Sequence, residues 1–278
     1  MNSTKVLNLA HSPDSDDAFM FYALARGLVK TGQLEFNHVL SDIETLNKKA
    51  LDGVYEITAL SVHAYAYVAH RYDILRHGAS IGEQYGPLLV ARQEMALSEL
   101  RGKRIAVPGK MTTAHLVLRL VEKNFDAILV PFDKVIDTVE RREAEVGLLI
   151  HEGQLTFSQH GLHKILDLGE WWHQETSLPL PLGVNGIRKD LEPSLQHDIA
   201  RIIKESISYS LGHRQEGLHY ALEFARGLKA SLADQFIGMY VNQETLDMSP
   251  RTQKAIETLL NRAFEEGLIP KRIHPMYV

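Results

Sequence analysis

Short apolar runs alternate with longer segments, in which apolar residues recur every three or four positions, along the first two thirds of the chain. The short runs are typical of buried strands, and the longer recurrence is typical of amphipathic helices. Strands are expected at residues 6–10, 34–40, 57–60, 87–92, 104–107, 127–131 and 147–150, and helices at 18–30, 43–51, 64–68, 114–123 and 135–142. This alternation favours an α/β fold with parallel strands. After residue 183, one further strand-like run precedes helices that are expected at 193–213, 215–226, 231–240 and 249–266.

The chain is expected to cross between two domains at two places. The proline-rich segment Leu178–Gly183 lies between two α/β blocks, and a second crossing is expected near Pro87–Arg92. Two crossings make the first domain discontinuous. We therefore expect a large α/β domain of residues 1–92 plus 183–278, a smaller α/β domain of residues 93–182, and a ligand cleft between them.

The composition excludes several classes of protein. Of 278 residues, 30 are basic and 35 acidic, which gives a net charge of −5 and no sign of the basic surface that binds nucleic acid. The absence of cysteine excludes disulfides, thiolate catalysis and cysteine zinc sites, and it fits a reducing cytosol. No signal-peptide pattern opens the chain, and no apolar stretch reaches the ~18 residues of a membrane span. We expect a cytoplasmic protein that binds neither nucleic acid nor membranes.

Four strand ends are rich in polar residues: His11–Asp17, Thr58–His63, Val107–Ala114 and Gly147–Gly153. Ligands of open α/β sheets bind beyond the carboxyl ends of the strands. These four segments are therefore the candidate site.

The first segment holds three carboxylates, Asp14, Asp16 and Asp17, beside Ser12. Ser12, Asp14 and Asp17 are natural helix N-caps, so capping is the alternative to a ligand contact here. The carboxylates lack the spacing and the closing glutamate of a calcium loop. We expect no metal at this segment.

The next two segments place hydroxyl groups at helix starts. Ser61 lies between a strand and a helix without the Gly-x-Ser-x-Gly pattern of a hydrolase nucleophile, which makes it a candidate contact for a polar ligand. Thr112, Thr113 and Ala114 open a helix whose free N–H groups suit carboxylate or phosphate oxygens. A simple N-cap is the alternative interpretation of this second group.

The fourth segment ends a buried apolar strand with His151. An imidazole titrates near neutral pH and can act as a general base, although a structural role is the alternative for a single histidine. His11, His63 and His160 are other candidates. The Trp171-Trp172 pair either lines the binding site of an aromatic ligand or covers the edge of a domain. From the residues alone, the chain is a two-domain cleft protein that binds or converts a small molecule.

A resemblance to a known family extends over nearly the whole chain. The motifs that carry it are Ser12-Pro13, Asp17–Leu24, Asp42–Asn47, Leu60-Ser61, Gly86–Leu88, Val107–Gly109, Thr112–Ala114, Leu149–Glu152, Asp167–Trp172, Leu178–Gly183, Tyr240–Asn242 and Leu246-Asp247. In order and spacing they resemble the 1,4-dihydroxy-6-naphthoate synthases of the futalosine pathway to menaquinone. The wider family includes chorismate dehydratases and solute-binding-like proteins.

This resemblance implies a periplasmic-binding-protein type II fold, with two α/β lobes around a ligand cleft. It implies a carbon–carbon lyase that cleaves cyclic dehypoxanthinyl futalosine to 1,4-dihydroxy-6-naphthoate without a metal or organic cofactor. The histidine of the family's Ile-His-Glu motif falls on His151 as the catalytic base. The expected substrate contacts are Ser12, Asp16, Leu60, Ser61, Thr112, Thr113 and Ala114. The alternatives are a non-catalytic binding protein for a small carboxylate and a related enzyme with a different substrate.

One segment departs from the family. Where the family commonly has Ser-Pro-Cys-Pro-Asn-Asp-Thr, this chain has Ser-Pro-Asp-Ser-Asp-Asp-Ala at residues 12–18. The carboxylate of Asp16 stands in the place of an amide, and its charge opposes a carboxylate ligand unless it faces away or is neutralised. Asp17 directly precedes the apolar helix, so we expect it to be the N-cap.

Overall fold

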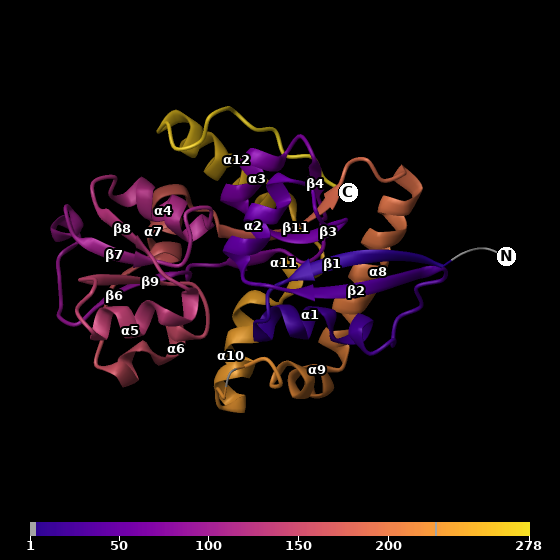
Figure 1. The fold of residues 1–278 in the computed structure, drawn as a ribbon, viewed down its shortest axis with the longest axis horizontal. Coiled ribbons are helices and arrows are strands. Elements are labelled where there is room, and N and C mark those ends of the chain that lie inside the picture. Colours follow the sequence, from indigo (N-terminus) through magenta and orange to yellow (C-terminus); the bar gives the residue numbers. More distant parts are fainter. Residues whose placement is uncertain (1–3, 226) are drawn as a thin grey trace.

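The computed structural model describes residues 4–225 and 227–278, which form two β-sheets with helices around each of them (Figure 1). The strands of the first sheet are β1 (Lys5–His11), β2 (Leu34–Leu40), β3 (Ile57–Ser61), β4 (Tyr72–Ile74), β5 (Ser80–Gly82) and β11 (Leu180–Arg188). Their order is β2-β1-β3-β11-β4, and β5 also pairs with β11. The strands of the second sheet are β6 (Leu88–Ala91), β7 (Arg104–Val107), β8 (Asp126–Leu129), β9 (Val146–Leu149) and β10 (His163–Asp167), in the order β10-β6-β9-β7-β8.

Helices surround each sheet, and a sheet with its helices is called a lobe below (Figure 1). The helices of the first lobe are α1 (Ser15–Ala25), α2 (Ile43–Leu51), α3 (Val62–Val68), α8 (Pro193–Gly212), α9 (Arg214–Ala221), α10 (Ala230–Tyr240), α11 (Gln243–Leu246) and α12 (Pro250–Glu265). Those of the second lobe are α4 (Thr113–Val121), α5 (Val135–Glu140), α6 (Gly153–Thr156) and α7 (Leu168–Thr176). Residues 1–3 of the predicted large domain and the predicted helix end at residue 226 lie outside the described residues. Among the described residues, no helix combines the length and the apolar character that a membrane span requires.

Both sheets are mixed, which corrects the predicted parallel arrangement. β1 pairs in parallel with β2 and β3, and β7 pairs in parallel with β8 and β9. β11 runs antiparallel to β3, β4 and β5, and β6 runs antiparallel to β9 and β10. The two antiparallel strands are those that follow a crossing between lobes. A chain that arrives from the other lobe enters the sheet at the edge where the parallel strands end, so it runs against them.

The strand pairing also places the two crossings between the lobes a few residues earlier in the chain than predicted. Leu88–Ala91, predicted for the first domain, pairs in the second sheet, whereas Leu180 already pairs with Gly82 in the first sheet. The chain therefore leaves the first sheet between residues 82 and 88 and returns to it at residue 180. The division of the chain into two domains stays a prediction.

One cluster of buried apolar side chains extends through both lobes. It includes Leu60 of the first lobe together with Leu116 and Trp172 of the second. Trp172 is fully buried, and its indole N–H donates to the carbonyl of Pro179 at 3.0 Å, while Trp171 packs against the same cluster. Trp172 is thus a core residue and does not wall a ligand.

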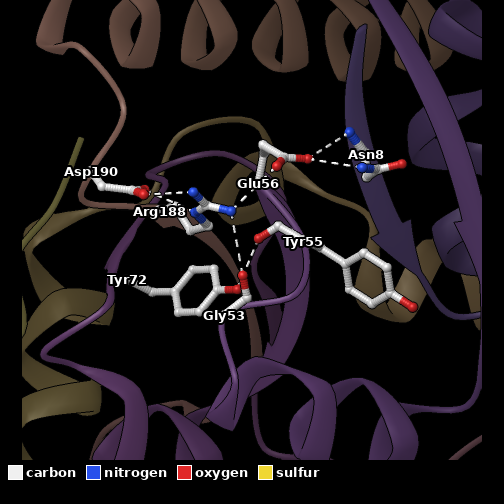
Figure 2. Close-up of polar contacts among 7 residues, drawn as sticks. All are labelled: Asn8, Gly53, Tyr55, Glu56, Tyr72, Arg188 and Asp190. Carbon is white, nitrogen blue, oxygen red and sulfur yellow. Dashed lines mark hydrogen bonds and ion pairs between the residues drawn. The ribbon is translucent and has the colours of Figure 1, made fainter.

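A polar network joins β1, β3 and β11 at the end of the first sheet where β3 begins (Figure 2). The guanidinium of Arg188 donates to Glu56 at 3.3 Å, to the carbonyl of Gly53 at 3.4 Å and to both carboxylate oxygens of Asp190. The other oxygen of Glu56 accepts from the backbone and side-chain nitrogens of Asn8, both at 3.0 Å. The network ties the three strands together, because Asn8 lies in β1, Arg188 ends β11 and Glu56 directly precedes β3.

We predict that Arg188→Met lowers the free energy of unfolding by about 1–3 kcal/mol, because it removes hydrogen bonds to charged, partly buried partners. Urea denaturation measures this loss. The matched control is Arg201→Met, which removes an exposed pair with Glu205 on α8 and should cost at most about 1 kcal/mol. Equal losses in the two variants would contradict the role assigned to the network.

Candidate active site

A cavity lies between the two lobes, where β1, β3 and β7 end. It has about 770 Å³ of empty space, including space that is open to solvent. Its wall contains all seven residues predicted to contact a substrate, which are Ser12, Asp16, Leu60, Ser61, Thr112, Thr113 and Ala114. These residues come from three of the four candidate segments, and the fourth segment reaches the wall through Ile150.

The hydroxyls of the two threonines are used within the protein. Thr112 is the N-cap of α4, and its Oγ1 accepts from the backbone N–H of His115 at 3.2 Å. The hydroxyl of Thr113 donates to the carbonyl of Leu182 at 2.6 Å. The backbone N–H groups of Thr113 and Ala114, in the first turn of α4, have no partner within the helix. A ligand anion at this end of the cavity would therefore meet backbone N–H groups rather than threonine hydroxyls.

The first segment folds differently from the prediction. α1 begins at Ser15 with Asp14 in the N-cap position, so the expectation that Asp17 caps the helix is wrong. Asp17 lies in the first turn, and its carboxylate accepts from the backbone N–H of Ser12 at 2.7 Å. The helix starts earlier because acidic side chains stabilise a first helical turn as well as an N-cap position. Ser12 donates its hydroxyl to Asp14.

Two carboxyl groups at this end of the cavity, those of Asp16 and Asp17, have raised pKa values. Burial is the main cause that raises the pKa of Asp16 well above its usual range, and the carboxylates of Asp17, Asp14 and Glu152 add to the effect. Burial also raises the pKa of Asp17 to about 7, although the N–H of Ser12 opposes that shift. A protonated Asp16 does not repel an anionic ligand. The described residues contain no group of three or more histidine, aspartate or glutamate side chains that could hold a metal ion.

His151 is buried but is not on the wall of the cavity, although its neighbour Ile150 is. The ring of His151 packs edge-on against Phe132, with 4.6 Å between ring centroids. Glu152 crosses to the first lobe, where it accepts from the hydroxyl of Ser15 at 2.8 Å. The fourth segment therefore contacts the first segment through Glu152.

The other candidate histidines have structural partners. His63 faces the carbonyl of Thr112 at 3.3 Å, and burial lowers its pKa to about 4. His11 contacts the ring nitrogen of His38 at 3.1 Å and, mainly through burial, has a pKa lowered to about 3. His160 is exposed and pairs with Glu140 at 3.0 Å. None of the three lies on the cavity wall among the residues described.

A sequence profile described as "Menaquinone biosynthesis" matches residues 7–265. The chain belongs to the menaquinone biosynthesis family. Two curated relatives, both named 1,4-dihydroxy-6-naphtoate synthase, match over 274 residues. The Thermus thermophilus protein is 38% identical over 99% of this chain and 100% of its own length, and the Streptomyces coelicolor protein is 33% identical over 96% of each.

Solved structures show the fold of this menaquinone biosynthesis family member. Protein AF1704 from Archaeoglobus fulgidus is 46% identical and superposes with a TM-score of 0.92 over 95% of this chain and 98% of its own. A Candida albicans protein, described as having the generic periplasmic binding protein fold, is 14% identical with a TM-score of 0.66 over 98% of each chain. An alkanesulfonate-binding protein from Xanthomonas axonopodis pv. citri is 12% identical with a TM-score of 0.74 over 98% of this chain and 97% of its own. The predicted periplasmic-binding-protein fold is confirmed.

Several polar residues near the cavity of this menaquinone biosynthesis protein were missed by sequence reasoning. Asn185 of β11 and Tyr240 of α10 lie on the wall, and Asn47 of α2 bonds to Ser61 from behind it. Asn47 and Asn185 are almost fully buried. The available signal was a polar side chain on a face of a predicted element that is otherwise apolar, since buried amides are retained where their hydrogen bonds are satisfied.

We predict that Asp16→Asn raises the free energy of unfolding at pH 7.5, because burial and the neighbouring carboxylates raise the pKa of Asp16 in the folded protein and so disfavour its charged form there. Below the pKa of an unfolded aspartate, ~3.9, both states are protonated and the favourable contribution is complete. This contribution to the free energy of unfolding is lost as the pH rises through the raised pKa that Asp16 has in the folded protein. Asparagine does not titrate, so the variant does not lose it. The gain at pH 4.5 should therefore be smaller.

Denaturation at the two pH values measures the effect, with exposed Asp198→Asn on α8 as the control. A gain of the same size at both pH values would contradict a protonated Asp16.

Proposed function

We propose that the protein is a 1,4-dihydroxy-6-naphthoate synthase that cleaves cyclic dehypoxanthinyl futalosine. The observation that carries the proposal is the match, over the full length, to relatives with that name, since this match includes the motifs whose residues line one cavity. A match of this extent to named enzymes favours the synthase over a binding protein without chemistry. The absence of cysteine suits a reaction in the reducing cytoplasm.

The reaction in this proposal breaks a carbon–carbon bond. A base removes a proton next to a ring carbonyl, and the electron pair left behind forms a double bond as the carbon–carbon bond breaks. The departing fragment carries off the electrons of the broken bond and takes up a proton, and formation of the aromatic naphthoate makes the step favourable. His151 is the proposed base, because it follows β9 two residues after the strand ends and directly after the wall residue Ile150. Its ring now lies against Phe132, so the segment that follows β9 has to turn toward the cavity when substrate binds.

The two ends of the cavity suit different parts of the substrate. The N–H groups of Thr113 and Ala114 suit its carboxylate, because they lie at the positive end of the α4 dipole. Asp16, with its raised pKa, suits hydroxyl or carbonyl oxygens, since a protonated carboxyl both donates and accepts. Leu60 supplies an apolar surface. The substrate would then lie with its carboxylate toward the second lobe.

We further propose that each lobe is a domain and that the chain between them, residues 83–87 and 177–179, acts as a hinge. Polar contacts between the lobes, such as the bond between Ser15 and Glu152, belong to the closed arrangement. Closure around a substrate excludes water from the reacting atoms.

We predict that His151→Ala lowers kcat by about 10²–10⁴-fold, the usual contribution of a positioned base, while the affinity for 1,4-dihydroxy-6-naphthoate changes little. Release of dihydroxynaphthoate from the authentic substrate, followed by chromatography, measures kcat. The control is His160→Ala, which removes an exposed histidine paired with Glu140.

Two results would count against these assignments. A wild-type protein that releases no dihydroxynaphthoate overturns the proposed function. A wild-type rate in His151→Ala overturns only the assignment of the base.

A further inference from the structure

Two side chains of α2 hold both backbone polar groups of one residue in the second lobe. The carboxylate of Glu44 accepts from the N–H of Met111 at 3.0 Å, and the amide of Asn47 donates to the carbonyl of Met111 at 3.4 Å. Residues three apart lie on the same face of a helix, so Glu44 and Asn47 together face the loop that carries Met111. This loop connects β7 to α4 and ends at the cavity residue Thr112.

The loop approaches α2 by its backbone. At Gly109 an added Cβ atom would overlap the carboxylate of Glu44, so a side chain there would push the loop away. Glu44 is 8% exposed and pairs with Lys48 at 3.5 Å. A nearly buried carboxylate whose oxygen meets a backbone N–H is a specific contact, since hydrogen bonds with a charged partner are about twice as strong as neutral ones.

Asn47 makes a second pair of contacts, to Ser61 in its own lobe. Its Oδ1 accepts from the backbone N–H of Ser61 at 2.9 Å, and its Nδ2 donates to the Ser61 hydroxyl oxygen at 3.0 Å. The backbone N–H of Ser61 can only donate, which fixes the amide orientation with Oδ1 toward it and Nδ2 toward the hydroxyl. Because Nδ2 also only donates, the Ser61 oxygen is the acceptor in that contact. The hydroxyl proton is left to point elsewhere, and Ser61 lies on the cavity wall.

We propose that Asn47 is a positioning residue that couples closure of the lobes to the direction of the Ser61 hydroxyl. When the lobes close, Met111 docks on Glu44 and Asn47, and its carbonyl adds a second contact to the Asn47 amide that the Ser61 N–H orients, which holds the amide more firmly in the orientation that turns the Ser61 proton into the cavity. The Ser61 hydroxyl then donates its proton to an oxygen atom of the bound ligand. The inference rests on the proposed function, because it takes this ligand to be the substrate of the synthase.

Asn47→Asp tests the coupling, because it keeps the shape and the acceptor for the Ser61 N–H but loses both donated bonds. The Ser61 hydroxyl then donates to the new carboxylate, away from the ligand. We expect kcat/KM to fall about 10–100-fold, which is the size of effect expected when one hydrogen bond to the ligand is lost. Ser61→Ala should cause a similar loss, and the double variant should lose little more than either single one.

The control is Met111→Ala, which retains both backbone groups of Met111 and should keep kcat/KM near the wild-type value. Glu44→Ala should raise KM with little change in kcat, and Glu44→Gln, which keeps an acceptor oxygen, should restore most of the loss. Independent roles for Asn47 and Ser61 would instead give additive losses in the Asn47→Asp and Ser61→Ala pair. Additive losses overturn the proposal.

A measurement without turnover covers variants that fold poorly and separates this inference from the proposed function. Hydrogen exchange at the Met111 amide should be faster in Glu44→Ala and Asn47→Asp than in the wild type and in Met111→Ala. Unchanged exchange in both α2 variants overturns the coupling, whether or not the protein is a synthase. A wild-type protein that shows the exchange pattern but no product overturns only the synthase assignment.

Discussion

β11 pairs with β3, β4 and β5. This pairing positions both the end of the first sheet that lies at the cavity and the opposite end, where the polar network lies. Its register places Gly183 opposite Ser61 at the cavity and Ile187 opposite Ile57 at the other end. One strand therefore connects the polar network around Arg188 to the wall of the cavity. Because β11 is also the return from the second lobe, the same pairing sets where that lobe attaches.

The cavity combines two kinds of polar wall. At one side, donors come from the backbone of α4, whose threonine hydroxyls are already bonded within the protein. At the other side, Asp16 and Asp17 present carboxyl groups whose pKa values are raised mainly by burial. Such a site distinguishes the two ends of an asymmetric ligand, because one end offers backbone N–H donors and the other offers carboxyl groups.

The sequence was sufficient to predict the α/β class and the segments that meet at the cavity, because strand ends with polar residues meet at one sheet edge. It was insufficient for the direction of β6 and β11, since apolar runs read the same in either direction. Asp17 was wrongly predicted as the N-cap because Asp14 and Asp17 are equally good caps in local sequence. His151 packs against Phe132 and is not on the wall, and no local pattern reveals that packing. Asn47 was missed because its partners lie 14 and 64 residues away.

The apolar cluster that contains Leu60, Leu116 and Trp172 belongs to both lobes at once. Separating the lobes completely would expose that surface to water, so any opening has to pivot around it. Transplanting the second lobe alone would leave its part of this cluster exposed to water, although each lobe also has an apolar cluster of its own. Sequence changes at the shared cluster in one lobe are therefore constrained by the other.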